Sequence, residues 1–268
     1  MTGSRYVLDV AQREFLTVLR TRALLAVAVG YVLLVGGAAW LAGTGSYLAL
    51  VLDLLTPVEL LVPVLAFAVG YRALLADRES GELQTIRTCP VSGHWYVFGV
   101  YLGRAVVVVG VVVVGHAVAG AAVPMAGEST LSVVASHATV DSPALYLRYV
   151  LVTALFALVA LSLALLVSAT ARSSRAGLAL ATGAVVALVA GLDGALLGSL
   201  TAGVVPPDAA TALLGLSPNT AYRSLVFELS VAPTGVTVPE GHSAILGGVA
   251  LITWLVAALG FASVLAWR

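Results

Sequence analysis

The stretch DRESGELQTIRTCPVSGHW, residues 77–95, is a concentrated polar segment in a chain that is otherwise apolar. Only 10% of the 268 residues are charged and 60% are hydrophobic, and long runs of Val, Leu, Ala and Gly flank the segment on both sides. A soluble globular domain is about 45–50% apolar. The composition therefore predicts an integral membrane protein in which this polar segment connects two spans.

Six segments are long and apolar enough to cross a membrane. A spanning helix needs about 20 mostly apolar residues, because lipid offers the backbone no hydrogen-bond partners. We therefore expect an all-α membrane protein with a single transmembrane domain over residues 1–268. The predicted spans cover residues 23–42, 57–76, 96–123, 147–168, 177–200 and 244–266.

The arginines indicate how the chain is oriented. All 13 basic residues are Arg, and cytoplasmic flanks of membrane helices are enriched in basic residues. With the N-terminus inside, only Arg148 and Arg223 fall outside. The distribution predicts a multi-pass protein of the plasma membrane with both termini in the cytoplasm. The arginines expected inside are Arg5, Arg13, Arg20, Arg22, Arg72, Arg78, Arg87, Arg104, Arg172, Arg175 and Arg268.

The N-terminal stretch SRYVLDVAQREFLTVLR, residues 4–20, has the spacing of an amphipathic helix. We expect this helix to lie along the inner membrane surface. The alternative is an inward extension of the first span. Its apolar stripe consists of Val7, Val10, Ala11, Phe15, Val18 and Leu19.

A second short helix is expected between the fifth and sixth spans. Ser217 before Pro218 is a good N-cap and first-residue pair, and apolar residues then recur at helical spacing. This pattern predicts a short amphipathic helix on the outer face. The recurring residues are Ala221, Tyr222, Leu225 and Leu229.

The polar segment at residues 77–95 has its own pattern. Gly81 interrupts the helical spacing, Leu83 and Ile86 form a short apolar ridge, and Pro90 ends the pattern. Ser92 can cap the helix that follows. We expect a short helix across the inner surface, and its charged residues favour a docking surface for another protein.

Two motifs resemble a known family. DRESGELQTIRTCPVS (residues 77–92) and LSPNTAYRSL (residues 216–225), together with the N-terminal interfacial helix, look like type-2 ABC transporter permeases. The similarity is strongest to the six-span permeases grouped with the nitrous oxide reductase (copper-enzyme) maturation permease. Cys89 departs from this pattern, since many relatives carry an apolar or small residue there.

The resemblance implies a partner set and a coupling site. It implies that the permease pairs with a second copy, as a homodimer or related heterodimer, and with two cytoplasmic ATPase subunits, and that it works as an exporter. Residues 77–95 would be the coupling helix that contacts the ATPase. The matching positions are Glu79, Gly81, Glu82, Leu83, Ile86 and Pro90.

The residue inventory argues against catalysis by this chain. The phosphate-binding loop of ATPases requires a Lys, and the sequence has none. We expect ATP and Mg to be bound by the partner ATPase, no cofactor on this chain, and no nucleic-acid partner. The single Cys excludes an intrachain disulfide, and the four His and two Met are too scattered to predict a metal site.

The alternative function is an ion-coupled secondary transporter or a channel. Such proteins usually carry charges at membrane depth and an internal repeat, and no repeat is visible here. Glu59, His116 and Asp193 are candidates for lining the outer half of a substrate path, although Glu59 and Asp193 could instead reach the outer interface. The substrate itself remains open among a drug, a lipid, a peptide and a sulfur or copper species.

Close helix contacts are suggested by two GxxxG pairs, since glycine lets helix backbones approach each other. The pairs are Gly99 with Gly103 and Gly194 with Gly198. They are weak support for a dimer, because the chain contains 27 glycines.

Overall fold

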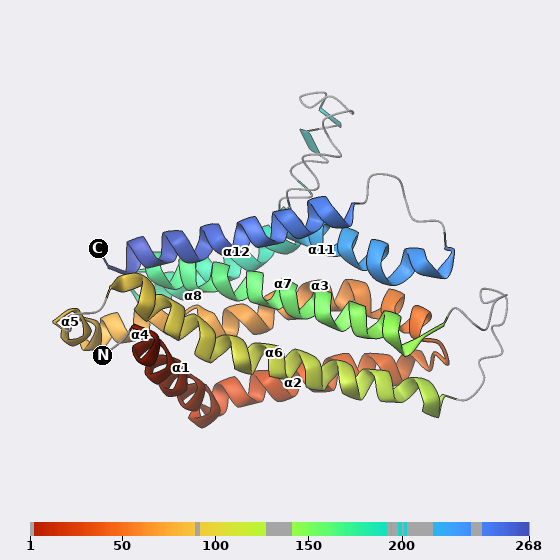
Figure 1. Ribbon diagram of the computed structural model, residues 1–268, viewed down its shortest axis with the longest axis horizontal. Helices are drawn as coiled ribbons and strands as arrows, with labels where there is room; N and C mark the ends of the chain where they lie inside the picture. The colour runs from red at the N-terminus through yellow and green to blue at the C-terminus, as the bar shows by residue number, and fades with distance from the viewer. Residues whose placement is uncertain are drawn as a thin grey trace.

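The chain forms an elongated bundle of helices (Figure 1). The computed structural model describes residues 3–88, 92–126, 141–191, 217–236 and 243–267, with isolated positions between 194 and 202. Within these ranges the regular structure is entirely helical. Six helices are long and apolar enough to cross a membrane, which confirms the predicted all-α, six-span architecture.

Four of the spanning helices agree closely with the predicted segments. The first, third, fourth and sixth spans each begin and end within four residues of the expected bounds, because continuous apolar sequence dictates them. These helices are α2 (Arg22–Ala42), α6 (Gly93–Met125), α7 (Pro143–Thr170) and α12 (Ala244–Ala266). The fifth span begins as α8 (Ser174–Val186) and continues as the π-helical turn η1 (Ala187–Gly191), beyond which few residues are described.

Both termini lie at one end of the bundle, which we call the terminal end (Figure 1). Helix α1 (Gly3–Arg20) runs obliquely across this end. The short helices α4 (Ala73–Glu79) and α5 (Glu82–Arg87) also lie there, and α5 protrudes beyond the spanning helices. The polar segment is therefore outside the apolar part of the bundle, as expected.

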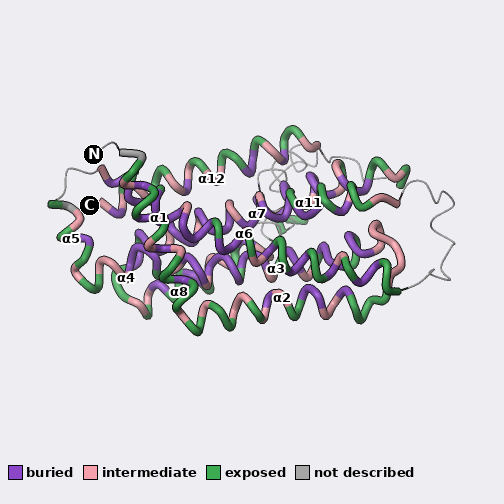
Figure 2. Tube along the Cα trace, turned by 60° about the horizontal axis from the view of Figure 1, so that its bottom comes forward, coloured by how far each residue is buried: buried purple, intermediate pink, exposed green. Residues whose placement is uncertain are grey.

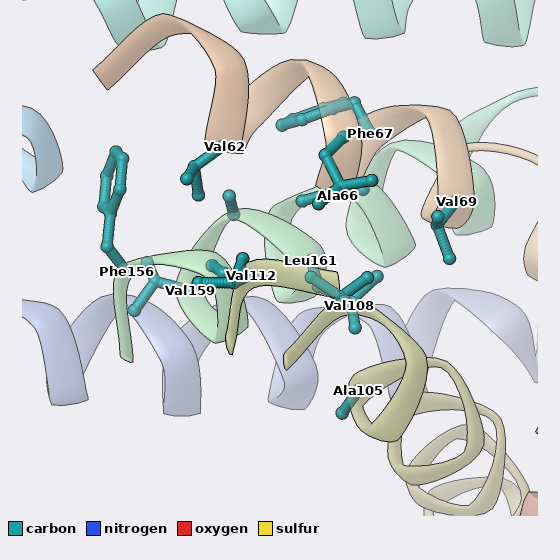
Figure 3. Packing of buried hydrophobic residues seen from close by; sticks show 14 of the residues in the cluster. Val62, Ala66, Phe67, Val69, Ala105, Val108, Val112, Phe156, Val159 and Leu161 are labelled. Atoms are coloured by element: carbon teal, nitrogen blue, oxygen red, sulfur yellow. The ribbon is translucent and has the colours of Figure 1, made fainter. Parts of the chain in front are cut away.

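The core is formed where α3 (Tyr47–Gly70), α6 and α7 meet. Val62 and Ala66 of α3 lie on the side of the helix toward Val112 of α6 and Leu161 of α7 in this region (Figure 3). Buried positions are concentrated along these three helices, whereas α2 and α12 expose much of their length at the periphery (Figure 2). The exposed apolar surface of the outer helices suits contact with lipid tails or with another membrane helix.

Helix α3 begins ten residues earlier than the predicted second span, so the expected start at Pro57 is wrong. Ser46 caps the helix by accepting a hydrogen bond from the Ala49 N–H at 3.4 Å. Asp141 is distant in the sequence, and its carboxylate accepts hydrogen bonds from the backbone N–H groups of Tyr47 and Leu48, both at 2.9 Å. These acceptors satisfy the free N–H groups of the first turn. Proline is tolerated inside membrane helices, so Pro57 does not mark the start.

Helix α1 is separate from α2, because Thr21 between them has an extended backbone. The alternative of one continuous helix is therefore wrong. Part of the predicted apolar stripe, Val7, Val10 and Val18, is buried. It packs against α6 rather than only against a membrane surface, because Gly99 and Gly103 leave space for it. An added Cβ at Gly99 would lie 2.8 Å from the Val10 side chain. This glycine pair therefore serves a contact within the chain.

The predicted helix after Ser217 is present as α11 (Pro218–Val226), which continues as the π-helical turn η2 (Phe227–Val231) and the short η3 (Ala232–Thr234). Most of α11 is buried against α12 and α7, so it packs into the bundle and does not lie free on its surface. Tyr222 stacks on Phe156 of α7 with ring centroids 4.5 Å apart. The helix runs beside the half of the bundle opposite the terminal end (Figure 1).

Candidate functional site

The α4–α5 segment, residues 73–88, folds as the polar sequence predicts. Gly81 breaks the helix with φ of 79°, a left-handed conformation that glycine adopts without steric cost. Glu82 then begins α5. Ser92 is the N-cap of α6, as expected, although its hydroxyl bonds the His94 ring at 3.0 Å and not the helix backbone. Pro90, expected to end the segment, lies outside the described residues.

Arg13 of α1 connects the α4–α5 segment to the N-terminal helix. Its guanidinium donates to Asp77 at 2.5 Å, to Glu82 at 3.2 Å and to the neighbouring Glu14 at 2.8 Å. Asp77 also accepts the hydroxyl of Tyr96 from α6. Burial disfavours the charged form of Arg13, but the Asp77 and Glu14 carboxylates outweigh this and raise the pKa of the guanidinium. The arginine is therefore a fixed positive centre.

A second arginine extends this cluster into the bundle. Arg104 of α6 is buried and contacts the buried Glu14 through two nitrogens, at 2.7 and 2.8 Å. It also donates to the backbone carbonyl of Val69 in the last turn of α3. We call Arg13, Glu14, Asp77, Tyr96 and Arg104 the arginine junction. The junction ties α1, α3, α4 and α6 together at the terminal end.

The two residues after Asp77 bind two further elements. Arg78 donates to the carbonyl oxygens of Ala169 and Ala171, at 3.1–3.2 Å, where α7 ends. Glu79 accepts hydrogen bonds from the backbone N–H and the hydroxyl of Ser174, where α8 begins. The charged run in the sequence thus anchors the segment to its own chain.

The predicted apolar ridge of α5 has two different sides. Leu83 is 3% exposed and belongs to the core, so it is not accessible to a partner in this conformation. This differs from the expectation that Leu83 contacts the ATPase: α5 protrudes, but its Leu83 side chain points inward and joins the hydrophobic cluster. Ile86 is partly buried, and the exposed described positions nearby are polar, namely Ser80, Glu82, Gln84, Thr85 and Thr88.

Glu59 lies near the middle of the span and not at its outer end. At 1.5 Å per residue it is roughly 18 Å from the first residue of α3. Its buried carboxylate is bound by both Nε and Nη2 of Arg223 from α11, with the Nε contact at 2.8 Å. The earlier start of α3 therefore places Glu59 near the middle of the helix, where it forms an ion pair with Arg223.

His116 is fully buried in the α6 part of the core. Its Nδ1 is 2.9 Å from the carbonyl oxygen of Val112, so Nδ1 carries the proton and Nε2 can only accept. The rings of Tyr31, Tyr146 and Tyr149 surround it, with Tyr149 closest at 5.3 Å between centroids. Asp193, the third residue expected along a substrate path, lies outside the described residues.

An apolar groove of about 410 Å³ opens between α2, α3 and α8. Its lining residues include the apolar Leu24, Phe67 and Val185. Tyr71 and Thr182, which carry hydroxyl groups, also line it. Neither Glu59 nor His116 lines it. The groove offers apolar contact area with few hydrogen-bonding groups.

The described residues hold no group of three or more His, Cys, Asp or Glu side chains that could bind a metal. Sequence reasoning did not identify the arginine junction or the Glu59–Arg223 pair. A signal for the junction exists in the sequence: Glu14 interrupts the apolar stripe Val7, Val10 and Val18, and Arg104 interrupts an apolar span. Opposite charges in two apolar faces indicate that the faces pack together.

Comparison with known proteins agrees with the architecture. A family model described as ABC-2 family transporter protein matches residues 8–267. The chain is also similar to the probable ABC transporter permease protein NosY of Pseudomonas aeruginosa, with 28% identity over 273 residues that cover 97% of this chain and 95% of the relative. The resemblance expected from the two motifs is confirmed. With six helices able to span a membrane and a family match over nearly its whole length, the chain belongs to the ABC-2 family of transporter proteins.

Proposed function

We propose that this chain is the permease subunit of an ATP-driven exporter that works with a second permease copy and with separate ATPase subunits. The observation that carries the proposal is the α4–α5 segment. It protrudes from the terminal end of the bundle, presents polar residues outward and is bonded to four other helices of its own chain, α1, α6, α7 and α8. A connection that served only to join two spans would not need this many anchors.

In this proposal the ATPase binds the outward side of α5. Ile86 supplies the apolar contact, and Glu82 sets orientation through basic groups of the ATPase. Leu83 and Gly81 keep the helix in place, since one is buried in the core and the other makes the turn. Glu79 acts on α8 and Pro90 ends the segment.

The test is co-purification of the partner ATPase subunit with this chain. Ile86→Asp places a carboxylate in the contact and should abolish co-purification, because an unpaired buried charge is costly. The matched control is Thr170→Asp, which adds the same group at an exposed position of the same end. If Ile86→Asp inserts normally and retains the ATPase at the wild-type level, docking through α5 is excluded.

The orientation in the membrane has a separate test. The arginine distribution supports a cytoplasmic terminal end, and the polar segment must be cytoplasmic to meet an ATPase. In a Cys89→Ser background, Thr234→Cys should react with an impermeant thiol reagent added to intact cells, and Thr170→Cys should not. Labelling at position 170 but not at position 234 would reverse the orientation.

The groove between α2, α3 and α8 is the proposed substrate path. It is mostly apolar, so it suits a molecule with a large apolar part, carried between the bilayer interior and the permease dimer. Glu59 and His116 would then support the path from within the core and would not line it.

The Glu59–Arg223 pair favours a second candidate, an ion-coupled carrier, because such carriers use charges at membrane depth. The purified chain in liposomes distinguishes the two. A permease subunit should leave an imposed proton or sodium gradient intact without its ATPase. Dissipation of the gradient by the chain alone, absent in Glu59→Gln, would support the carrier.

A further inference from the structure

Three consecutive residues at the end of α4 bind four different helices of the bundle. Asp77 binds Arg13 of α1 and Tyr96 of α6, Arg78 binds the end of α7, and Glu79 binds the start of α8. Among these contacts, that of Glu79 is made with the first residue of a spanning helix, α8. The end of α4 therefore contacts several helices at once, and its Glu79 contacts the first residue of the fifth span directly.

The Glu79 contact has the geometry of a helix cap supplied by another segment. Its Oε1 accepts the N–H of Ser174 at 2.8 Å and the hydroxyl at 2.9 Å, while Oε2 lies 2.8 Å from the same hydroxyl. Ser174 is the first residue of α8, where backbone N–H groups lack partners within the helix. A carboxylate is also favoured there by the helix dipole.

The contact is exposed, so it can open and close at low cost. The Glu79 side chain is 35% exposed, and its other partner, Arg72 at 3.3 Å, is 49% exposed. Water can replace either partner, and surface ion pairs contribute little net stability. The arginine junction is different, because Glu14 and Arg104 are buried there.

Helix α8 is held loosely along its length. Its buried residues are Gly177 and Ala181, whereas α7 buries residues along its whole length. A helix with few buried contacts is displaced more easily than the core around it. Leu178, Thr182 and Val185 of α8 also line the groove, so a shift of α8 changes the width of the groove.

We propose that Glu79 is the positioning residue through which movement of the α4–α5 segment reaches α8 and thereby the groove. The inference rests on the proposed function, in which that segment contacts an ATPase. When the ATPase displaces the segment, the Glu79 carboxylate moves with it. The start of α8 then either follows the carboxylate or loses its hydrogen bonds to it. Arg78 and Asp77 hold the neighbouring helices during this movement.

The test breaks the contact from the α8 side, so that the docking surface is untouched. Ser174→Pro removes both donors to Glu79, the N–H and the hydroxyl. Proline fits the first position of a helix, and the extended backbone of Ser173 is the conformation that a following proline requires. Ser174→Ala removes only the hydroxyl and should give a partial effect.

The measurement uses the complex with its ATPase in nanodiscs, in a Cys89→Ser background with Thr182→Cys as the labelling site in the groove. In the otherwise unchanged complex the thiol-labelling rate at position 182 should change when ATP and vanadate are added. Ser174→Pro should lose this change while the ATPase still co-purifies. Ser243→Ala, which removes the capping hydroxyl at the start of α12 instead, should keep it.

Two outcomes would overturn the inference. One is an ATP-dependent change in Ser174→Pro that equals that of the unchanged complex, and the other is no change at position 182 in the unchanged complex. Failure of the proposed function is a different result, since the ATPase would then not co-purify with any version of the chain. Glu79→Gln, which keeps one acceptor oxygen, should resemble Ser174→Ala and confirm that the two residues act on each other.

Discussion

Two parts of the molecule bury a carboxylate with an arginine, and they do so in different ways. At the terminal end, Glu14 is contacted by both Arg13 and Arg104, and the junction spreads over several helices. In the opposite half, Glu59 is bound by Arg223, which joins α3 to α11. Charge shared among several elements tolerates the loss of one partner, whereas a carboxylate bound by one arginine does not. The comparison predicts unequal costs for the same truncation.

The largest effect is expected from Arg223→Ala. This change leaves the buried Glu59 carboxylate without its guanidinium donors, and an unsatisfied buried charged group costs about 3 kcal/mol of unfolding free energy. Thermal unfolding of the purified chain in detergent measures the loss. The double variant Glu59→Leu with Arg223→Leu should recover most of it, because removing both charges leaves neither one unpaired. A double variant as unstable as Arg223→Ala would show that the loss comes from packing.

Arg104→Ala should cost less, about 2 kcal/mol, although Arg104 is the more buried arginine. Glu14 keeps the contact of its Oε1 with Arg13, while its Oε2 and the Val69 carbonyl lose their donor. The same unfolding measurement gives the answer. If Arg104→Ala is more destabilising than Arg223→Ala, the sharing of Glu14 has no protective effect.

Gly103→Ala tests the packing that brings the junction together. An added Cβ at this position would overlap the backbone carbonyl of Ala11 in α1, so α1 must move away from α6. Overpacking of this kind costs about 1–2 kcal/mol. Gly110→Ala is the matched control on the same helix, because its Cβ would meet no atom within 4 Å. Equal stability of the two variants would mean that α1 is not held closely against α6.

The smallest effect is expected from Glu82→Gln. Its carboxylate is 58% exposed and 3.2 Å from Arg13, and exposed pairs contribute about 0–1 kcal/mol. Unfolding should be unchanged within error at physiological salt. A loss as large as that of Arg104→Ala would show that the junction extends to the surface of α5.

The sequence by itself determined the number of spans, their order and the place of the polar segment. Continuous apolar runs fix these features, since a helix is the structure that satisfies the backbone of such a run in lipid. Sequence also predicted the helix after Ser217 and the break at Gly81, because proline and glycine restrict the backbone locally. The site was predicted only as a segment, with Glu79, Glu82 and Ile86 on it.

Tertiary structure alone decided what these residues touch. The start of α3 depends on Asp141, a residue 94 positions from Tyr47, so local pattern misplaced it and with it the depth of Glu59. Leu83 is buried because it joins the hydrophobic cluster, and α11 is buried because it packs against α7 and α12. The partners of Glu14, Asp77 and Glu79 lie on other helices. Helix packing sets these pairings, and one-dimensional periodicity holds no information about which faces meet.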